Sequence, residues 1–215
     1  MNVHLAVKGF SGLVREQEVL KPFGSLKPFT QLPKRAVRRL SDLERGVAAC
    51  LMGLDESQEN GLGDSAIVLA SRYGAMTNTL ELLKFINQDE ALSPTSFSLS
   101  VHNAAVGVAS QLTKNHGGHT AIAAGERSLL EGLTECYARI KDGATSIVFM
   151  YSDCHLTQEY AEFGDTDKDV QFALLLEEVT IGESGPSHQI EGGSAGALSC
   201  LEAISDGVSE IQWKI

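Results

Sequence analysis

Short apolar runs alternate along this chain with longer segments whose apolar residues recur every three or four positions. The runs at residues 66–74, 146–151 and 170–179 predict strands buried on both faces, because polar residues do not alternate with the apolar ones. Residues 3–8 alternate between large aliphatic side chains and His, Ala or Lys, which predicts a further strand. The proline-containing segment that follows, up to Pro33, predicts a loop.

Helical spacing predicts the elements between these strands. The expected helices are one starting after Ser41 (Leu43, Val47, Leu51), one at 75–90 (Leu80, Leu83, Ile86), one at 101–118 rich in small residues, one at 128–141 (Leu129, Leu130, Leu133, Tyr137, Ile140) and a last one at 192–207. Strands that alternate with helices of this length are typical of α/β proteins. The sequence therefore predicts one α/β domain over residues 1–215, with a mostly parallel mixed sheet flanked by helices.

The stretch around which the chain is organised lies at residues 117–142. A short strand is predicted from His119 to Ala123, and it turns sharply at Gly125 into the helix at 128–141. Strand, tight turn, helix and strand form the outline of a nucleophile elbow, in which the first helical residue projects above the sheet near polarising N–H groups. An enzyme of this plan needs Cys or Ser there, and this chain has Ala124, Gly125, Glu126 and Arg127.

Charge and composition narrow the classes of partner. With 17 basic and 28 acidic residues the formal net charge is −11, whereas nucleic acids and anionic membranes require a basic surface. The apolar runs are also too short to span a bilayer, so we expect a soluble protein with no membrane or nucleic-acid partner. The four cysteines are far apart and no secretory leader is present, which predicts a cytoplasmic location.

Metal and phosphate sites are not indicated. Six histidines are present, but none has the spacing of a metal-binding motif and no carboxylate cluster accompanies them, so we expect no metal and no cofactor. The Gly192–Gly193 pair lacks the spacing and the lysine of a phosphate-binding loop.

Nucleophiles outside the turn remain an alternative. Cys50, Cys136 and Cys200 are predicted to be buried helix residues. Cys154 precedes His155, and adjacent residues on a strand point to opposite faces, an argument that holds only if the strand continues past Asp153. Ser128, one turn into the helix, is a further candidate, although no histidine near it in the sequence is placed to activate it.

From Ser93 onward, the order of these motifs resembles the N-terminal half of a β-ketoacyl-ACP synthase of the thiolase fold. The matching features are Ser93–Pro94, the small-residue helix, Gly117–Gly118, the strand and elbow, and the runs LLEG, ARIKDG, SIVFMYSD and FALLLEE. The resemblance implies half of a thiolase-like fold.

The departures from that family are informative. The family's elbow carries a cysteine, whereas the corresponding residue here is Ala124, Gly125, Glu126 or Arg127, and an ungapped count from Ser93–Pro94 favours Glu126. Active members are also considerably longer, and their second half supplies two histidines and a lysine. The segment around His188 faintly resembles the Gly-His-Thr part of that half, but no role is carried over to it.

A thiol-less relative of this kind resembles a chain-length factor, which is the non-catalytic partner of a ketosynthase in polyketide or aryl-polyene biosynthesis. These pathways elongate an acyl chain in a fatty-acid-like way. The resemblance implies a heterodimer with a full-length β-ketoacyl-ACP synthase, which in turn receives the acyl carrier protein. It implies pairing through the strand of the elbow (His119, Thr120, Ala121, Ile122, Ala123), and a partner tunnel bordered by the small-residue helix (Asn103, Ala105, Gly107).

Two other functions stay open. One is a small acyltransferase or hydrolase that uses Ser128 or a cysteine as its nucleophile. The other is a scaffold that binds an acyl carrier protein without a catalytic partner, although carrier proteins are usually acidic and so is this chain.

Overall fold

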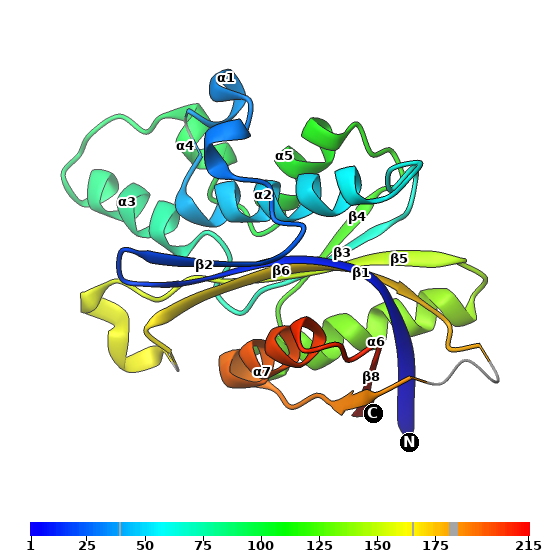
Figure 1. Ribbon diagram of the computed structural model, residues 1–215. Helices are drawn as coiled ribbons and strands as arrows, with labels where there is room; N and C mark the ends of the chain where they lie inside the picture. The colour runs from blue at the N-terminus through cyan, green and yellow to red at the C-terminus, as the bar shows by residue number, and fades with distance from the viewer. Residues whose placement is uncertain (39, 165, 181–184) are drawn as a thin grey trace.

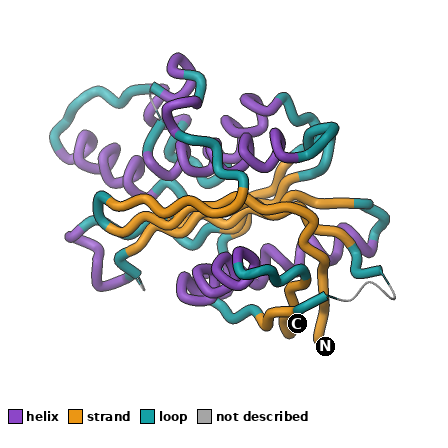
Figure 2. The backbone as a smooth tube through the Cα atoms, viewed as in Figure 1, coloured by secondary structure: helices purple, strands orange, loops and turns teal. Residues whose placement is uncertain are grey.

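A mixed sheet of eight strands runs through the middle of the molecule (Figures 1 and 2). The computed structural model describes residues 1–38, 40–164, 166–180 and 185–215. The strands are β1 (Asn2–Glu16), β2 (Val19–Gly24), β3 (Ile67–Ala70), β4 (His119–Ile122), β5 (Ser146–Asp153), β6 (Lys168–Glu177), β7 (Ser187–Gln189) and β8 (Glu210–Lys214). Their order in the sheet is β4-β3-β5-β6-β1-β8-β7, and β2 pairs with β1.

The expected α/β class and mixed sheet are confirmed, but parallel pairing is not in the majority. β3 runs parallel to β4 and β5, and β7 runs parallel to β8. The pairs β5–β6, β6–β1, β1–β8 and β1–β2 are antiparallel. Three neighbouring strands run parallel only at the β4-β3-β5 end, which contains the turn singled out from the sequence.

The predicted loop before Pro33 is wrong over much of its length. β1 continues to Glu16 and forms a hairpin with β2, in which Pro22 lies opposite Leu13. Proline cannot donate a backbone hydrogen bond, but an edge strand has one side on which no donor is needed. Pro22 is therefore compatible with β2, which lies at an edge.

Helices cover both faces of the sheet (Figures 1 and 2). They are α1 (Lys34–Val37), α2 (Asp42–Ser57), α3 (Met76–Asn87), α4 (Pro94–Ser98), α5 (Ala104–Thr113), α6 (Ser128–Lys141) and α7 (Gly193–Ser205), with 3-10 turns η1 (Phe29–Gln31), η2 (Gly125–Arg127) and η3 (Gln158–Phe163). α1 to α5 lie on one face, and α6 and α7 lie on the other. Within the described residues, no helix has the length and apolarity needed to cross a bilayer.

The alternation of side chains along the central strands builds two hydrophobic cores. Ile67 and Leu69 of β3 point toward α2 and α5, whereas Val68 and Ala70 point toward α6 and α7. All four residues of β3 are buried. The uninterrupted apolar run in the sequence is thus explained by a strand that is covered on both faces.

Local signals place the helix α2 accurately. Its N-cap is Ser41, whose Oγ accepts from the Glu44 N–H while the Glu44 carboxylate accepts from the Ser41 N–H. This capping box confirms the predicted helix start.

In α3 the predicted apolar face is only partly covered. Leu80 is buried, but Leu83 and Ile86 on the same predicted face are exposed, and the neighbouring Leu82 is buried instead. The helix itself is confirmed, but Leu83 and Ile86 are only partly covered, and Leu83 borders a shallow pocket that it shares with Tyr160 of the segment after β5.

The same substitution in two helices should have opposite effects. A Cβ at Gly132 in α6 would lie 2.7 Å from the Ala70 Cβ and 2.8 Å from the Phe149 ring, so we expect Gly132→Ala to destabilise the fold by about 1–3 kcal/mol. A Cβ at Gly107 in α5 would meet only the His119 ring, at 3.8 Å or more, so Gly107→Ala should stabilise by up to about 1 kcal/mol through helix propensity. Urea unfolding of both variants measures this, and shifts of equal sign would contradict the packing described here.

Candidate functional site

The turn between β4 and α6 lies at the carboxyl end of the parallel strands. β4 ends at Ile122, and the residues from Ala123 to Arg127 are all exposed. Gly125 has φ +59°, in the left-handed region that favours glycine, and a Cβ placed on it would meet no atom within 4 Å. The sharpest point of the turn is therefore Gly125, and the space above it is open.

The other side chains of the turn form ion pairs with their surroundings. Glu126 lies 3.9 Å from the Arg72 guanidinium, and Arg127 pairs with Glu131 at 2.7 Å. The Glu126 carboxylate and the Arg127 guanidinium are well exposed, and exposed ion pairs of this kind contribute little to stability. With Ala124, these residues complete a turn that presents no nucleophile.

Ser128 has a structural position rather than a reactive one. Its side chain is buried, its Oγ donates to the Gly125 carbonyl at 2.7 Å, and it accepts from the Ala124 N–H at 2.9 Å. Both bonds close the turn on itself, so the hydroxyl is directed away from the open space above Gly125.

The cysteines are protonated thiols in their folded environments. Cys50, Cys136 and Cys200 are buried as predicted, and burial raises the pKa of each thiol, that of Cys200 to about 12. Burial, with the Asp169 and Asp153 carboxylates nearby, raises the pKa of Cys154 well above its ordinary value. None of the four thiols has the thiolate character that a nucleophile requires.

A buried carboxyl organises the ends of β3 and β5. Asp153 accepts hydrogen bonds from Ser71 Oγ (2.9 Å), from the Arg72 and Tyr73 N–H groups (2.8 and 3.3 Å) and from the Tyr151 hydroxyl (2.7 Å). Burial nevertheless raises the pKa of this carboxyl, because desolvation outweighs these donors. The network fixes the chain between β3 and α3.

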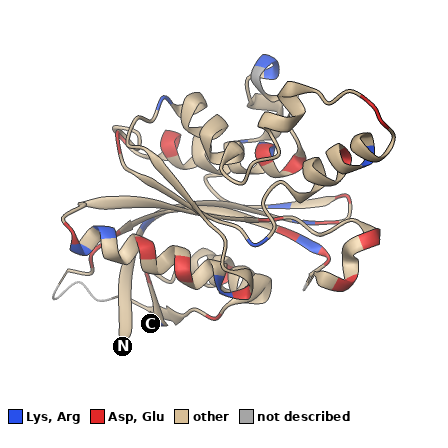
Figure 3. Cartoon of the chain, turned by 180° about the vertical axis from the view of Figure 1, so that it is seen from behind, with Lys and Arg blue, Asp and Glu red and all other residues tan. Residues whose placement is uncertain are grey.

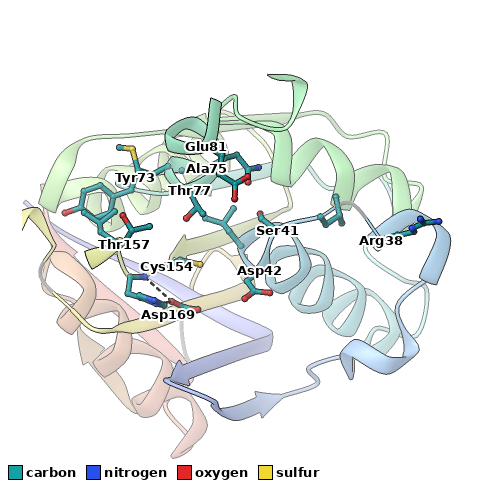
Figure 4. A pocket seen from close by; sticks show the side chains of 17 residues that line it. Arg38, Ser41, Asp42, Tyr73, Ala75, Thr77, Glu81, Cys154, Thr157 and Asp169 are labelled. Carbon is teal, nitrogen blue, oxygen red and sulfur yellow. Dashed lines mark hydrogen bonds and ion pairs between the residues drawn. The ribbon is translucent and has the colours of Figure 1, made fainter. Parts of the chain in front are cut away.

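A cavity of about 500 Å³ opens beside this network (Figure 4). Ser41 and Asp42 come from the start of α2, Thr77 and Glu81 come from α3, and Cys154 follows β5. Strand β5 ends at Asp153, so Cys154 and His155 are not held on opposite faces of a strand, and both line the cavity.

His155 is paired with Asp169 rather than with Cys154. Its Nδ1 lies 2.7 Å from the buried Asp169 carboxylate, and its backbone N–H donates to the same oxygen. Arg15 lies 3.8 Å from Asp169 as well. The sequence analysis did not predict this pair, because the two residues lie 14 positions apart in the sequence and no local motif links them. The sequence feature that could have suggested it is that His155 follows one apolar run and Asp169 precedes the next.

Histidines do not gather into a metal site within the part of the chain that the structure describes. No group of three His, Cys, Asp or Glu side chains there is arranged to hold a metal ion. His188 lies in β7, where its Nε2 is 3.1 Å from Ser199 Oγ.

β4 has an open edge. The carbonyls of Gly118 and Ile122 accept from the N–H groups of Ile67 and Ser71 in and beside β3. Because backbone groups alternate in direction along a strand, the N–H and C=O of His119 and Ala121 face away from β3. Seen from behind, α5 lies above β4 and α6 lies below it (Figure 3).

The other edges are less suited to pairing. β2 contains Lys21 and Pro22, two residue types that block the addition of a strand. β7 has only three residues. Among the described edge strands, only β4 has four or more residues and also lacks proline, lysine and arginine.

Helix α5 borders this edge, but its predicted residues differ in position. Asn103 is exposed at the N-cap, and Gly107 is half-buried with His119 as its nearest neighbour. Ala105 is buried and packs in the core against α2 residues. Of the small residues proposed to border a tunnel, Ala105 therefore faces the interior of this chain and Gly107 faces the β4 side.

The sequence matches a family model described as "Beta-ketoacyl synthase, N-terminal domain" over residues 13–202. No curated protein matches the sequence significantly.

Solved structures share the fold. One chain of the ketosynthase (ApeO) in complex with its chain length factor (ApeC) from Xenorhabdus doucetiae is 24% identical, with a TM-score of 0.78 over 95% of this chain and 92% of that chain. A chain of the ishigamide ketosynthase/chain length factor is 15% identical with a TM-score of 0.65, covering 86% of this chain and 64% of that one. A β-ketoacyl synthase from Burkholderia phymatum STM815 is 11% identical with a TM-score of 0.58, covering 82% of this chain and 59% of that one. The chain thus spans less than two thirds of the length of the last two.

Substituting Ser128 tests whether its hydroxyl is structural. We expect Ser128→Ala to lower the free energy of unfolding by about 1 kcal/mol, because the Ala124 N–H loses its acceptor and the Gly125 carbonyl loses its donor. Labelling with a serine-directed fluorophosphonate should be absent from both the wild type and the variant. Stoichiometric labelling of the wild type that disappears in Ser128→Ala would show instead that the hydroxyl is a nucleophile.

Proposed function

The chain belongs to the family of β-ketoacyl synthase N-terminal domains, and we propose that it serves that family's chemistry as a non-catalytic subunit. In this proposal it resembles a chain-length factor and pairs with an active β-ketoacyl-ACP synthase. It stabilises that enzyme and shapes the tunnel in which the acyl chain grows. The pathway that we propose is a fatty-acid-like polyketide elongation of the aryl-polyene type.

The observation that carries the proposal is the elbow without a nucleophile. Condensation of this kind needs a thiolate to hold the growing acyl chain, and Ala124 to Arg127 supply no thiol. The positive φ at Gly125 favours Gly125 as the counterpart of the lost cysteine, one residue before the Glu126 that a simple count suggests. The buried Ser128 and the protonated thiols offer no substitute.

The similar structures support the choice of partner. Two of them are described as pairs of a ketosynthase and a chain length factor. In the match to the Xenorhabdus doucetiae complex, the alignment covers nearly the whole length of both chains. An acyl carrier protein would reach the complex through the ketosynthase, because the net charge of −11 disfavours direct docking of an acidic carrier on this chain.

The pairing that we propose uses the open edge of β4. The outward N–H and C=O groups of His119 and Ala121 would bond to a strand of the partner and continue the sheet across the interface. The half-buried side chains of Thr120 and Ile122 would lie within that interface.

A tunnel in the partner would pass the outer face of α5. Ala104, Gly107 and Val108 are half-buried on this face, and the helix carries no charged residue. Small, uncharged side chains would leave room for an acyl chain beside the interface.

Capture of the tagged chain from its own host, with mass spectrometry, tests the partner. We expect a full-length ketosynthase at a ratio of about one to one. Recovery of the folded chain alone would contradict the proposal.

Proline at position 121 should block the interface while leaving the chain folded. Ala121→Pro removes an N–H that faces away from β3, and proline is tolerated at such edge positions. We expect binding to the captured ketosynthase to weaken about two- to tenfold, since the lost backbone hydrogen bond contributes roughly 0.5–1.5 kcal/mol. Ala121→Val is the matched control and keeps the N–H.

A second control addresses the other side of the strand. Thr120→Pro removes a donor directed at β3 and should destabilise the isolated chain. Unchanged affinity of a folded Ala121→Pro chain would exclude β4 as the pairing edge.

A bulky side chain on α5 should shorten the products. Gly107→Phe would project toward His119 and into the space beside β4, so the reconstituted pair should release shorter acyl chains, as measured by mass spectrometry of the products. Gly107→Ala serves as the control and should leave product length unchanged. Products of normal length from a fully assembled Gly107→Phe pair would remove α5 from the tunnel.

A further inference from the structure

The side chain of Thr120, on the open edge of β4, is held from helix α6. Arg139 Nη2 donates to Thr120 Oγ1 at 2.7 Å, and Arg139 Nε donates to the Glu135 carboxylate at 2.7 Å. Glu135 lies one helical turn before Arg139, so the two charges compensate each other and the guanidinium is fixed in direction. We call Glu135, Arg139 and Thr120 the edge clamp.

The edge clamp determines what the Thr120 hydroxyl can do. A hydroxyl donates one proton and accepts through its oxygen, whereas an arginine only donates. The contact with Arg139 therefore occupies the oxygen and leaves the proton of the hydroxyl unused. Among the described residues, Arg139 is the one hydrogen-bond partner of this side chain, so the proton has no acceptor within that part of the chain.

The direction of Thr120 makes this proton available at the edge. Thr120 pairs with Val68 of β3 through the backbone, and its side chain faces α6, whereas the neighbouring His119 faces Gly107 of α5. A strand added to β4 would place a side chain beside Thr120 on the same face, about 5 Å away between Cβ atoms. At that distance a short side chain that carries an oxygen can accept from the hydroxyl.

We propose that Thr120 donates across the interface to an uncharged, oxygen-bearing side chain on the pairing strand of the ketosynthase, and that Arg139 is the positioning residue of this bond. The inference rests on the proposed function and adds to it the chemistry required of the partner at one position. Serine, threonine, asparagine and glutamine fit this requirement. A lysine or arginine there would face the Arg139 guanidinium, and a carboxylate would compete with Glu135, so both are disfavoured.

Substitution of Thr120 tests the bond itself. Thr120→Val removes the hydroxyl and nearly keeps the shape, so it leaves both Arg139 and the partner's oxygen without their bonds in the complex. The affinity for the ketosynthase that co-purifies with the wild-type chain, produced recombinantly, should fall about fivefold or more. Thr120→Ser keeps the hydroxyl and is the control, with an affinity within about twofold of the wild type.

Substitution of Arg139 tests the positioning role. Arg139→Met removes the guanidinium but keeps an apolar stem, and should weaken binding about two- to fivefold. Because Arg139 acts through the hydroxyl, the chain that combines Arg139→Met with Thr120→Val should bind no more weakly than Thr120→Val alone. Losses that multiply in the double variant would show that Arg139 acts independently and would overturn its positioning role.

The isolated variants should stay folded. The side chains of Arg139 and Glu135 are 31% and 35% exposed, and ion pairs at the surface contribute little to stability. The Tm of each variant should therefore lie within about 2 °C of the wild type. Arg127→Met, which removes the pair with Glu131 at the other end of α6, is the matched control for stability.

The binding data separate failure of this inference from failure of the proposed function. If a ketosynthase is captured and Ala121→Pro weakens its binding while Thr120→Val does not, the bond across the interface is absent and the pairing through β4 stands. If no ketosynthase is captured, the proposed function fails and this inference fails with it.

Discussion

Burial of β3 and β5 on both faces is the constraint from which the rest of the arrangement follows. A strand without a polar face needs a helical layer on each side, and α2 with α5 and α6 with α7 provide these layers. β4 is the next strand outward, so it receives α5 on one face and α6 on the other but no strand beyond it. The open edge and the exposed turn at Gly125 are thus products of how the two central strands are covered.

Buried carboxyl groups at the carboxyl ends of these strands hold the adjoining chain in place. Asp153 is surrounded by four donors that hold the chain between β3 and α3, and Asp169 holds His155. Both carboxyl groups are buried, and both lie close enough to Cys154 to oppose the formation of a thiolate. A site that keeps its nearest thiol protonated differs fundamentally from one that activates a nucleophile.

Local patterns predicted the parts of the structure that depend on local forces. The helix start at Ser41, the buried run of β3, the elbow and the helix α6 were all apparent in the sequence, because each is set by residues close together in the chain. The hairpin of β1 and β2 was missed because proline was taken as a strand breaker. Proline is tolerated at position 22 because β2 lies at an edge of the sheet.

The pairing of His155 with Asp169 and the inward direction of Ala105 depend on contacts between distant segments. The exposure of Leu83 and Ile86 likewise departs from a helical pattern that indicates burial. Our proposal of Gly125 as the counterpart of the family's cysteine also required geometry, because the sequence alone does not show the positive φ angle of Gly125.

The open edge of β4 has a consequence for the life of the chain inside a cell. A strand with free hydrogen-bonding groups and no proline or lysine to guard it can be joined by any extended segment that meets it. If the chain pairs through β4 as we propose, newly made chains that exceed the supply of the partner would be lost to aggregation or to proteolysis. Under that proposal, balanced synthesis of the chain and its partner would follow from the geometry of one four-residue strand.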